Sequence, residues 1–392
     1  MAHRTNNLPL YQPRDAPGAD SAVATATTTS LRRQTVDEPE GYATYLGTVL
    51  LKGSVPAKSD TYDPALDVEG IYKACHGMGT NNIKLIKILV KRTSQEIQIL
   101  QAAYMNKRQK QLVQLVISET SGSYQTAVAL LASGALGGDA YLLKKAVESK
   151  TSSRVRLALL TELIVMRSKP DLIKLKEYVS ATQHRSLASV VNDAIRMMDT
   201  SIQDGLIEAF RLCMLTDERV VGEEEVMSNV QIIKAFLEGE ETITTKRFLE
   251  LLLDRPLSYL RRLVDGYKTQ FYGVNLSQAV TESRDSRLSP ALKDVLGYAL
   301  LTAEHETEGT MEGVIRDARR IEADLQDDYL LTVRLVRAHW NSDRFRALLA
   351  EWAKLKPESG NPIKRVKKHT RLNLETLLVR MIEKAESVPM SS

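Results

Sequence analysis

The sequence predicts an all-α protein made of four related helical units behind a disordered N-terminal arm. Composition is the first observation: 43% of the 392 residues are hydrophobic but only 5% are aromatic, with 20 glycines and 12 prolines. Leu, Ala, Lys, Glu, Arg and Ile predominate, and this balance favours helices over a β-rich fold. A helical pattern that recurs after residue 61 is the second observation. The third is that residues 1–60 show no such pattern.

The bulk chemistry argues against several classes of protein. With 53 basic and 49 acidic residues the net charge is +4, too small an excess to imply nucleic-acid binding by itself. Cys75 and Cys213 lie in apolar helical patterns and form neither a disulfide framework nor a metal-ligand spacing, which suits a reducing compartment. The N-terminus has no apolar signal region and no apolar run approaches about 18 residues, so we expect no secretory signal and no membrane span.

Residues 1–60 are typical of a mostly disordered arm. ATATTTS at 24–30 and the scattered Pro and Gly follow neither a helical nor a strand period. A short ordered piece at YATYLGTVL, residues 42–50, is an exception that the pattern allows. RRQT at 32–35 matches a site for a basophilic kinase, although such short matches are common by chance.

From Tyr62 onward the sequence is helical and regularly interrupted. Asp63 and Pro64 suit the N-cap and first position of one helix, and Thr93 with Glu96 forms a capping-box pattern for another. Five short helices are predicted in this way before Gly134. They make up one unit.

The unit recurs along the chain. An Arg followed by apolar residues five and eight positions later occurs three times, and a weaker copy has Trp in place of Arg. The four copies are Arg92/Ile97/Leu100, Arg167/Leu172/Leu175, Arg255/Leu260/Leu263 and Trp340/Phe345/Leu348. Internal repetition of this length indicates a repeat architecture. The predicted division is an arm at 1–60, repeat 1 at 61–134, repeat 2 at 135–213, repeat 3 with a linker at 214–303, and a degenerate repeat 4 at 304–388.

Two glycines interrupt repeat 1 in CHGMGTNN, residues 75–82. Glycine tolerates positive φ and lets a ligand approach the backbone closely. A tight turn between helices is the simpler interpretation. The alternative is a loop that turns its carbonyl groups outward to hold a cation or a phosphate.

With these motifs the chain resembles the annexins. The resemblance spans about residues 62–388 and rests on GMGTNN, LIKILVKRTSQE and ISETSGSYQTAVALLASG in repeat 1, TELIVMRS in repeat 2 and RFLELLLDRPLSYLRRLVDGY in repeat 3. The long polar arm is similar to those of fungal and other lower-eukaryote members. The resemblance implies a curved disc of four five-helix repeats. On its convex face, the loops between the first two and the last two helices of each repeat would bind Ca²⁺ and acidic phospholipid.

The resemblance also implies a Ca²⁺ site in repeat 1. Its ligands would be the carbonyl groups of Cys75, Gly77 and Gly79, with a bidentate carboxylate from Glu119 in ETSG. Because Ca²⁺ takes 6–8 oxygen ligands, water and a lipid phosphate oxygen would complete the shell. An ion that bridges protein and membrane raises the affinity for each when the other is bound.

The chain departs from the family pattern elsewhere. Asn81 and Asn82 stand where annexins usually carry an acidic pair, so a minor second site is expected to be absent or weak. Counted by the spacing of repeat 1, Arg154, Thr242 and Asp327 replace the second glycine in repeats 2 to 4. The matching acid positions are Ala194 with Asp193 beside it, Glu282, and Lys367. We therefore expect repeats 2 to 4 to lack the standard site, although acids in GEET and LQDD leave another ion geometry open.

A basic cluster, KRVKKHTR at 364–371, stands where the family has an acidic loop. It fits a solvated helix end, a nuclear-import or nucleic-acid patch, or a direct contact with lipid phosphate. Basic residues near an anionic leaflet contribute about 1 kcal/mol each and are screened by salt. For the third interpretation the residues predicted to bind lipid are Lys364, Arg365, Lys367 and Lys368.

The leading hypothesis is a protein that binds acidic phospholipid, such as phosphatidylserine, in a Ca²⁺-dependent way. It would be cytoplasmic and peripheral on membranes or vesicles. The alternative is a largely Ca²⁺-independent scaffold that binds a protein partner or the cytoskeleton through the arm and the basic cluster. Nucleic acid is a less favoured partner, and self-association on membranes stays open.

No enzyme is expected, because the sequence shows no catalytic constellation. Four of its histidines have no Cys or carboxylate partner at a recognisable spacing. They are His76, His184, His339 and His369.

Overall fold

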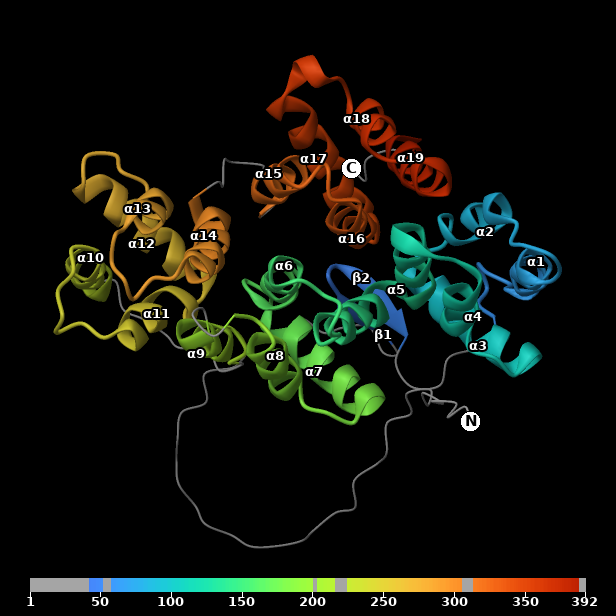
Figure 1. Ribbon diagram of the computed structural model, residues 1–392, viewed down its shortest axis with the longest axis horizontal. Helices are drawn as coiled ribbons and strands as arrows, with labels where there is room; N and C mark the ends of the chain where they lie inside the picture. Colours follow the sequence, from blue (N-terminus) through green and yellow to red (C-terminus); the bar gives the residue numbers. More distant parts are fainter. Residues whose placement is uncertain (1–41, 52–57, 200–202, 216–223, 305–312, 388–392) are drawn as a thin grey trace, which may run out of the picture.

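The computed structural model describes residues 42–51, 58–199, 203–215, 224–304 and 313–387 (Figure 1). Most of the predicted arm and the RRQT match lie outside these ranges. Within them the chain is almost entirely helical, as predicted, and its helices form four groups around a common centre (Figure 1).

The first group lies at the right of Figure 1, and the second lies below the centre. The first contains α1 (Ala65–Cys75), α2 (Asn82–Leu89), α3 (Ser94–Arg108), α4 (Leu112–Glu119) and the first half of α5 (Gly122–Ala146). The second contains the other half of α5 with α6 (Ser153–Ile164), α7 (Lys169–Gln183), α8 (Leu187–Arg196) and α9 (Gln203–Cys213).

The third and fourth groups complete the ring, at the left and the top of Figure 1. The third contains α10 (Glu224–Leu237), α11 (Thr245–Leu253), α12 (Leu257–Gln270), α13 (Leu276–Glu282) and α14 (Pro290–Glu304). The fourth contains α15 (Val314–Ala323), α16 (Asp328–His339), α17 (Ser342–Leu355), a 3₁₀ turn (Pro357–Ser359), α18 (Pro362–His369) and α19 (Leu372–Ser387). We call these groups repeats 1 to 4. Their residue boundaries stay predictions.

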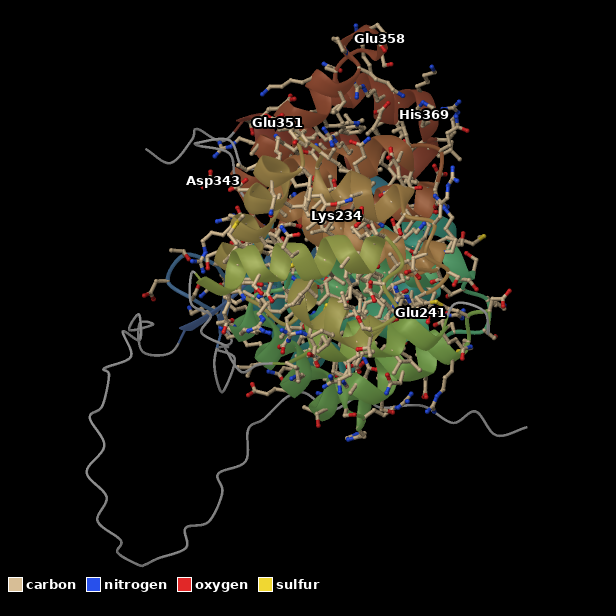
Figure 2. The ribbon with its side chains drawn as sticks, turned by 90° about the vertical axis from the view of Figure 1, so that its left-hand side faces the viewer. Lys234, Glu241, Asp343, Glu351, Glu358 and His369 are labelled. Carbon is tan, nitrogen blue, oxygen red and sulfur yellow. The ribbon has the colours of Figure 1, made fainter. Side chains whose placement is uncertain are left out.

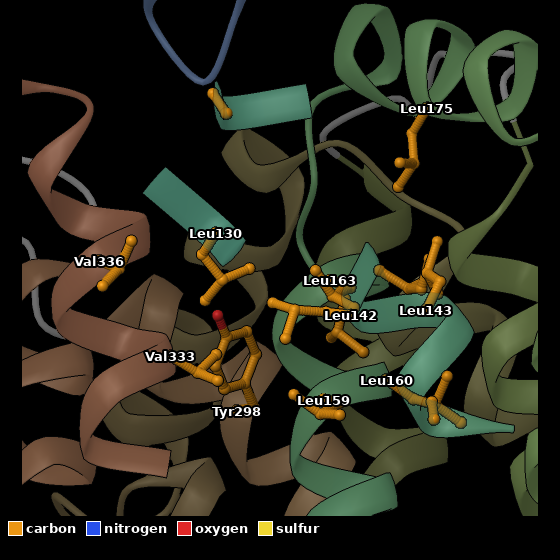
Figure 3. Packing of buried hydrophobic residues seen from close by; sticks show 14 of the residues in the cluster. Leu130, Leu142, Leu143, Leu159, Leu160, Leu163, Leu175, Tyr298, Val333 and Val336 are labelled. Atoms are coloured by element: carbon orange, nitrogen blue, oxygen red, sulfur yellow. The ribbon is translucent and has the colours of Figure 1, made fainter. Parts of the chain in front are cut away.

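α5 joins the first two groups and lies in the core. Gly134, with φ 72° and ψ −178°, breaks the helical path, and the amide of Ala135 donates to Ser94 Oγ at 3.0 Å. Among the described helices α5 is the one long and apolar enough to cross a membrane, but its most apolar stretch is 78% buried inside the protein. Figure 3 shows why: Leu130 and Leu142 of α5 share one apolar interior with Leu163 of α6 and Val333 of α16.

A small β-hairpin is added to the helices. β1 (Tyr42–Tyr45) pairs antiparallel with β2 (Thr48–Leu51). Leu46 and Gly47 between them both have positive φ, 53° and 70°, as a type I′ turn requires. The hairpin packs on α3 and α7. The short ordered piece allowed at residues 42–50 is therefore present, since these residues pair and pack on the helices.

Candidate functional site

The α1–α2 loop has the exposed glycine turn that the sequence suggests. Gly77 and Gly79 have φ of 118° and 83°, and no atom lies within 4 Å of the place where a Cβ would stand. Backbone conformation, not crowding, therefore requires glycine at both positions. The amide of Asn81 donates to the Ala74 carbonyl at 2.8 Å and closes the base of the loop, while Met78 at its tip is fully exposed.

The α4–α5 loop is held by side chains of its own. α4 ends at Glu119, and α5 begins at Gly122, whose φ is 61°. The side-chain Nε2 of Gln125 donates to the carbonyl groups of Ile117 at 2.7 Å and Thr120 at 2.6 Å. These bonds fix the end of α4 and so limit the positions open to the Glu119 carboxylate.

Thr80 joins the two loops. Its hydroxyl group lies 3.0 Å from the backbone oxygen of Glu119 and 3.1 Å from the carboxylate Oε2 of the same residue. Burial, and after it the charge of Glu119, raise the pKa of the Cys75 thiol to about 11. The structure thus brings Glu119 to the loop that contains Cys75, Gly77 and Gly79.

The donors available here suit a hard cation. The described residues contain no group of three or more His, Cys, Asp and Glu side chains that could hold a metal. A site in this loop pair would therefore depend on neutral backbone carbonyls and a carboxylate, which are ligands that Ca²⁺ accepts. Sequence reasoning missed Thr80, although its place directly after the second glycine was a usable signal.

In repeat 2 an arginine joins the corresponding loops. Arg156 of α6 is 2% exposed and donates to the carbonyls of Ala146 at 2.6 Å, Glu148 at 2.9 Å and Met197 at 3.1 Å. Ala146 and Glu148 lie at the α5–α6 loop, whereas Met197 directly follows α8. Asp193, beside the predicted acid position, is paired with Arg185 instead.

In repeat 4 the acidic α15–α16 loop is already neutralised. Asp327 caps α16 through the amides of Tyr329 and Leu330, and it accepts from Arg154 of repeat 2 at 2.8 Å. Asp324 is bound by Arg154 and, at 2.7 Å, by Arg334. Asp327 of LQDD and the nearby Asp324 thus have arginine partners, which gives no support to another ion geometry at these two carboxylates.

The acid position predicted for repeat 4 is wrong by two residues. Thr370 corresponds to Thr120, because the hydroxyl group of each donates to the carbonyl group four residues earlier. That carbonyl belongs to Val366 for Thr370 and to Val116 for Thr120. The residue before Thr370, which matches Glu119, is His369 and not Lys367. The fixed count fails because residues 356–361 separate α17 from α18, whereas only residues 109–111 separate α3 from α4, and α17 is one residue shorter than α3.

The basic cluster divides into two parts. Lys364, Lys367 and Lys368 are exposed on α18. Arg365 is 1% exposed, and its guanidinium donates to the carbonyls of Trp352 at 2.8 Å and Gly360 at 3.0 Å. The prediction that Arg365 contacts lipid is therefore wrong, because it lies on the inward face of α18 and caps the end of α17.

The loops of different repeats share one side of the molecule. Figure 2 shows Glu241 of the α10–α11 loop and His369 at the end of α18 on the same side, with Asp343 and the hairpin on the other. This arrangement agrees with the expectation that such loops line one face.

Comparisons with known proteins agree with the fold and the motifs. The family model described as Annexin matches residues 66–131. Annexin C1 of Cryptococcus neoformans is 25% identical over 327 residues, which are 82% of this chain and 66% of that protein. Mouse annexin A13 is 27% identical over 61% of this chain and 73% of its own length. The chain thus spans just under two thirds of the fungal relative.

Solved structures show the same fold. Chicken annexin V has a TM-score of 0.64 at 21% identity and covers 83% of this chain and 96% of its own. A structure described as calcium-bound annexin (Sm)1 has a TM-score of 0.61 at 14% identity, and the match covers 83% of this chain and 91% of that one. Annexins are generally non-enzymatic proteins that associate peripherally with membranes. The glycine-loop motif, the relatives and the fold together support an annexin family member, and annexins generally bind Ca²⁺ and phospholipids.

Proposed function

We propose that this protein binds acidic phospholipid membranes in a Ca²⁺-dependent way through repeat 1. The observation that carries the proposal is the bridge from Thr80 to Glu119, which sets a carboxylate beside an exposed glycine turn. The carbonyls of Cys75, Gly77 and Gly79 and the carboxylate of Glu119 would hold the ion. The expected location is cytoplasmic and peripheral on membranes or vesicles.

The ligand set explains why a lipid would join it. Bound Ca²⁺ supplies a positive charge that attracts a phosphate group. Neutral carbonyl oxygens and the single charge of Glu119 would leave that positive charge partly uncompensated, which favours a further anionic ligand. The hydroxyl of Thr80 orients the carboxylate toward the α1–α2 loop. Met78, fully exposed between the glycines, would place an apolar side chain against the headgroups.

The exposed lysines of α18 would add a contact that needs no Ca²⁺. Lys364, Lys367 and Lys368 lie near Leu372, which is 85% exposed at the start of α19. Ammonium groups attract an anionic surface, and an apolar side chain beside them can enter its headgroup region. Repeat 4 would therefore contribute a salt-sensitive attraction.

The first experiment is co-sedimentation with phosphatidylserine liposomes, with and without Ca²⁺. We expect the wild type to pellet with Ca²⁺ and Glu119→Gln to lose most of that pelleting, because one carboxylate ligand is gone. Glu282→Gln is the matched control, since Glu282 also ends the fourth helix of its repeat and is exposed. Equal pelleting of both variants would contradict the repeat 1 site. No pelleting of the wild type under either condition would favour the scaffold alternative.

A second experiment isolates the lysines. Replacing Lys364, Lys367 and Lys368 together by Glu should abolish Ca²⁺-free binding to the same liposomes at low salt, because attraction becomes repulsion. The control carries the same charge change at exposed lysines elsewhere, Lys107, Lys110 and Lys268. Calcium-free binding that is unchanged in the first variant, or equally reduced in the control, would refute the α18 contact.

A further inference from the structure

In repeat 3 the loop oxygens converge on a guanidinium group. Arg287 lies in the α13–α14 loop, and its Nη1 donates to the carbonyls of Ile243 at 2.7 Å and Glu240 at 3.3 Å. Its Nη2 lies 3.3 Å from the carbonyl of Phe236. All three carbonyls belong to the end of α10 and the α10–α11 loop, so one side chain collects the oxygens of a separate loop.

A carboxylate from the α13–α14 loop completes the set. Nε of Arg287 lies 2.9 Å and 3.0 Å from the two carboxylate oxygens of Asp285, whose side chain is 5% exposed. The centre of the guanidinium lies 4.0 Å from the Phe236 ring, a cation–π contact. Both the edges and one face of the cation are therefore occupied by groups that stabilise positive charge.

The donor types match those of repeat 1. There, the first loop offers carbonyls and the end of α4 offers a carboxylate. In repeat 3 the first loop again offers carbonyls, and Gly239 in it has φ of 93° with open space at its Cβ position. Thr242 replaces the second glycine as the count predicted, but Gly239, three residues earlier, makes a turn in this loop.

We propose that the α10–α11 and α13–α14 loops form a cation site whose resident cation is the guanidinium of Arg287, in place of a divalent metal ion. The comparison with repeat 1 rests on the proposed function, whereas the contacts of Arg287 do not. Arg287 is then the residue that decides ion specificity in repeat 3.

Physical chemistry favours the internal cation. A side chain attached to the loop has a high local concentration, so no free ion competes with it at low Ca²⁺. The guanidinium uses the lone pairs that a metal would need, and its charge repels a second cation. Arg287 also favours the ionised form of Asp285, because the hydrogen bond that Arg287 donates lowers the pKa of this carboxyl group. The loops of repeat 3 are therefore tied together at every Ca²⁺ concentration.

Removal of Arg287 should open the site to Ca²⁺. The test is isothermal titration of Ca²⁺ into the full chain without lipid, in a Glu119→Gln background. We expect Glu119→Gln to bind no Ca²⁺ and Glu119→Gln/Arg287→Ala to bind one ion per chain, because three carbonyls and Asp285 lose their cation. Arg284→Ala, an exposed arginine in the same loop, is the matched control and should add no site.

The outcomes separate the two proposals. If Glu119→Gln leaves Ca²⁺ binding unchanged, the repeat 1 site is wrong. If Arg287→Ala adds no bound ion while circular dichroism shows a native fold, the repeat 3 inference is overturned. Arg287→Lys keeps the charge and should gain no site. If Arg287→Lys gained as much bound Ca²⁺ as Arg287→Ala, the inference that the positive charge at residue 287 excludes the metal would be overturned.

Folding of the alanine variant gives a further criterion. Should Arg287→Ala not fold in Ca²⁺-free buffer, it is refolded with and without millimolar Ca²⁺. We expect native protein to be recovered only in the buffer that contains Ca²⁺, since the ion replaces the missing cation. Equal yields in both buffers would count against the site.

Discussion

His339 is a buried imidazole at the contact between α16 and the end of α2. It is 6% exposed, and its Nε2 has no hydrogen-bond partner among the described residues. The rings of Trp340 and Phe345 lie beside it. Burial, and after it the charge of Lys384, lower the pKa of His339 from 6.5 to about 3, against a hydrogen bond to the Val90 backbone that raises it. The folded protein therefore keeps this side chain neutral.

This burial predicts a loss of stability in mild acid. Below about pH 6.5 the unfolded chain binds a proton at His339 while the folded chain does not, so stability falls as pH drops toward about 3, by about 1.4 kcal/mol per pH unit. His339→Gln should lack this contribution and show a flatter profile. Urea unfolding at pH 7.0 and 5.0 measures it, with His184→Asn, an exposed site, as control. Parallel profiles for wild type and His339→Gln would show that His339 is not the cause.

Single residues also mark the limit of sequence reasoning. The residue types of the four basic residues in α18 do not show which of them is buried, yet Arg365 lies inward and the three lysines lie outward. Its neighbours Pro362 and Val366 are also buried, so the helical position, not the residue type, decides. Arg287 shows the same limit, because its role depends on carbonyls that are 44 to 51 residues away in the chain.

At the scale of elements, local patterns predicted the helices well. Thr93 and Glu96 form the capping box that the sequence suggested. α1 begins at Ala65, one residue later than predicted, with the amide of Ala65 bound by Asp63 Oδ1 at 2.9 Å. These signals act within one turn of helix, so they can be recognised without knowledge of the tertiary structure.

The hairpin could not be predicted in the same way. Two strands alone are marginally stable, so the contacts that hold them matter most. Tyr45 is fully buried, with its hydroxyl 2.9 Å from Asp139, and the amide of Leu46 donates to Asp171 at 3.0 Å. These partners lie 94 and 125 residues away in the chain. No local pattern in YATYLGTVL reveals them.

At the scale of the whole molecule, Asp139 joins three parts of the fold. Its carboxylate accepts from Arg167 at 2.8 Å, from Arg337 of α16 at 2.7 Å and from Tyr45 of the hairpin. Burial alone would raise the pKa of Asp139, but the charges of Arg337 and Arg167 outweigh it and hold the pKa below its usual value. Repeat 2, repeat 4 and the hairpin therefore share one buried charge.

This connection predicts a strong coupling between the repeats. Asp139→Leu should lower the free energy of unfolding by about 3–5 kcal/mol, because it leaves Arg167 and Arg337 buried without their shared carboxylate. Arg337→Met should cost less, since Arg167 still neutralises Asp139. The double variant removes two opposite charges at once, so its loss should be smaller than the sum of the two single losses by at least about 1 kcal/mol.

Chemical denaturation followed by circular dichroism and by fluorescence measures the cycle, and agreement of the two probes shows that the repeats unfold together. Additive losses would mean that Arg337 and Asp139 do not depend on each other, and the contact between repeats 2 and 4 would then be held by the apolar interior of Figure 3. Coupling would mean that the disc owes part of its rigidity to this one ion pair. In that case the variants should retain Ca²⁺-dependent liposome binding at temperatures where they stay folded, because Asp139 lies outside the loops proposed to bind the ion.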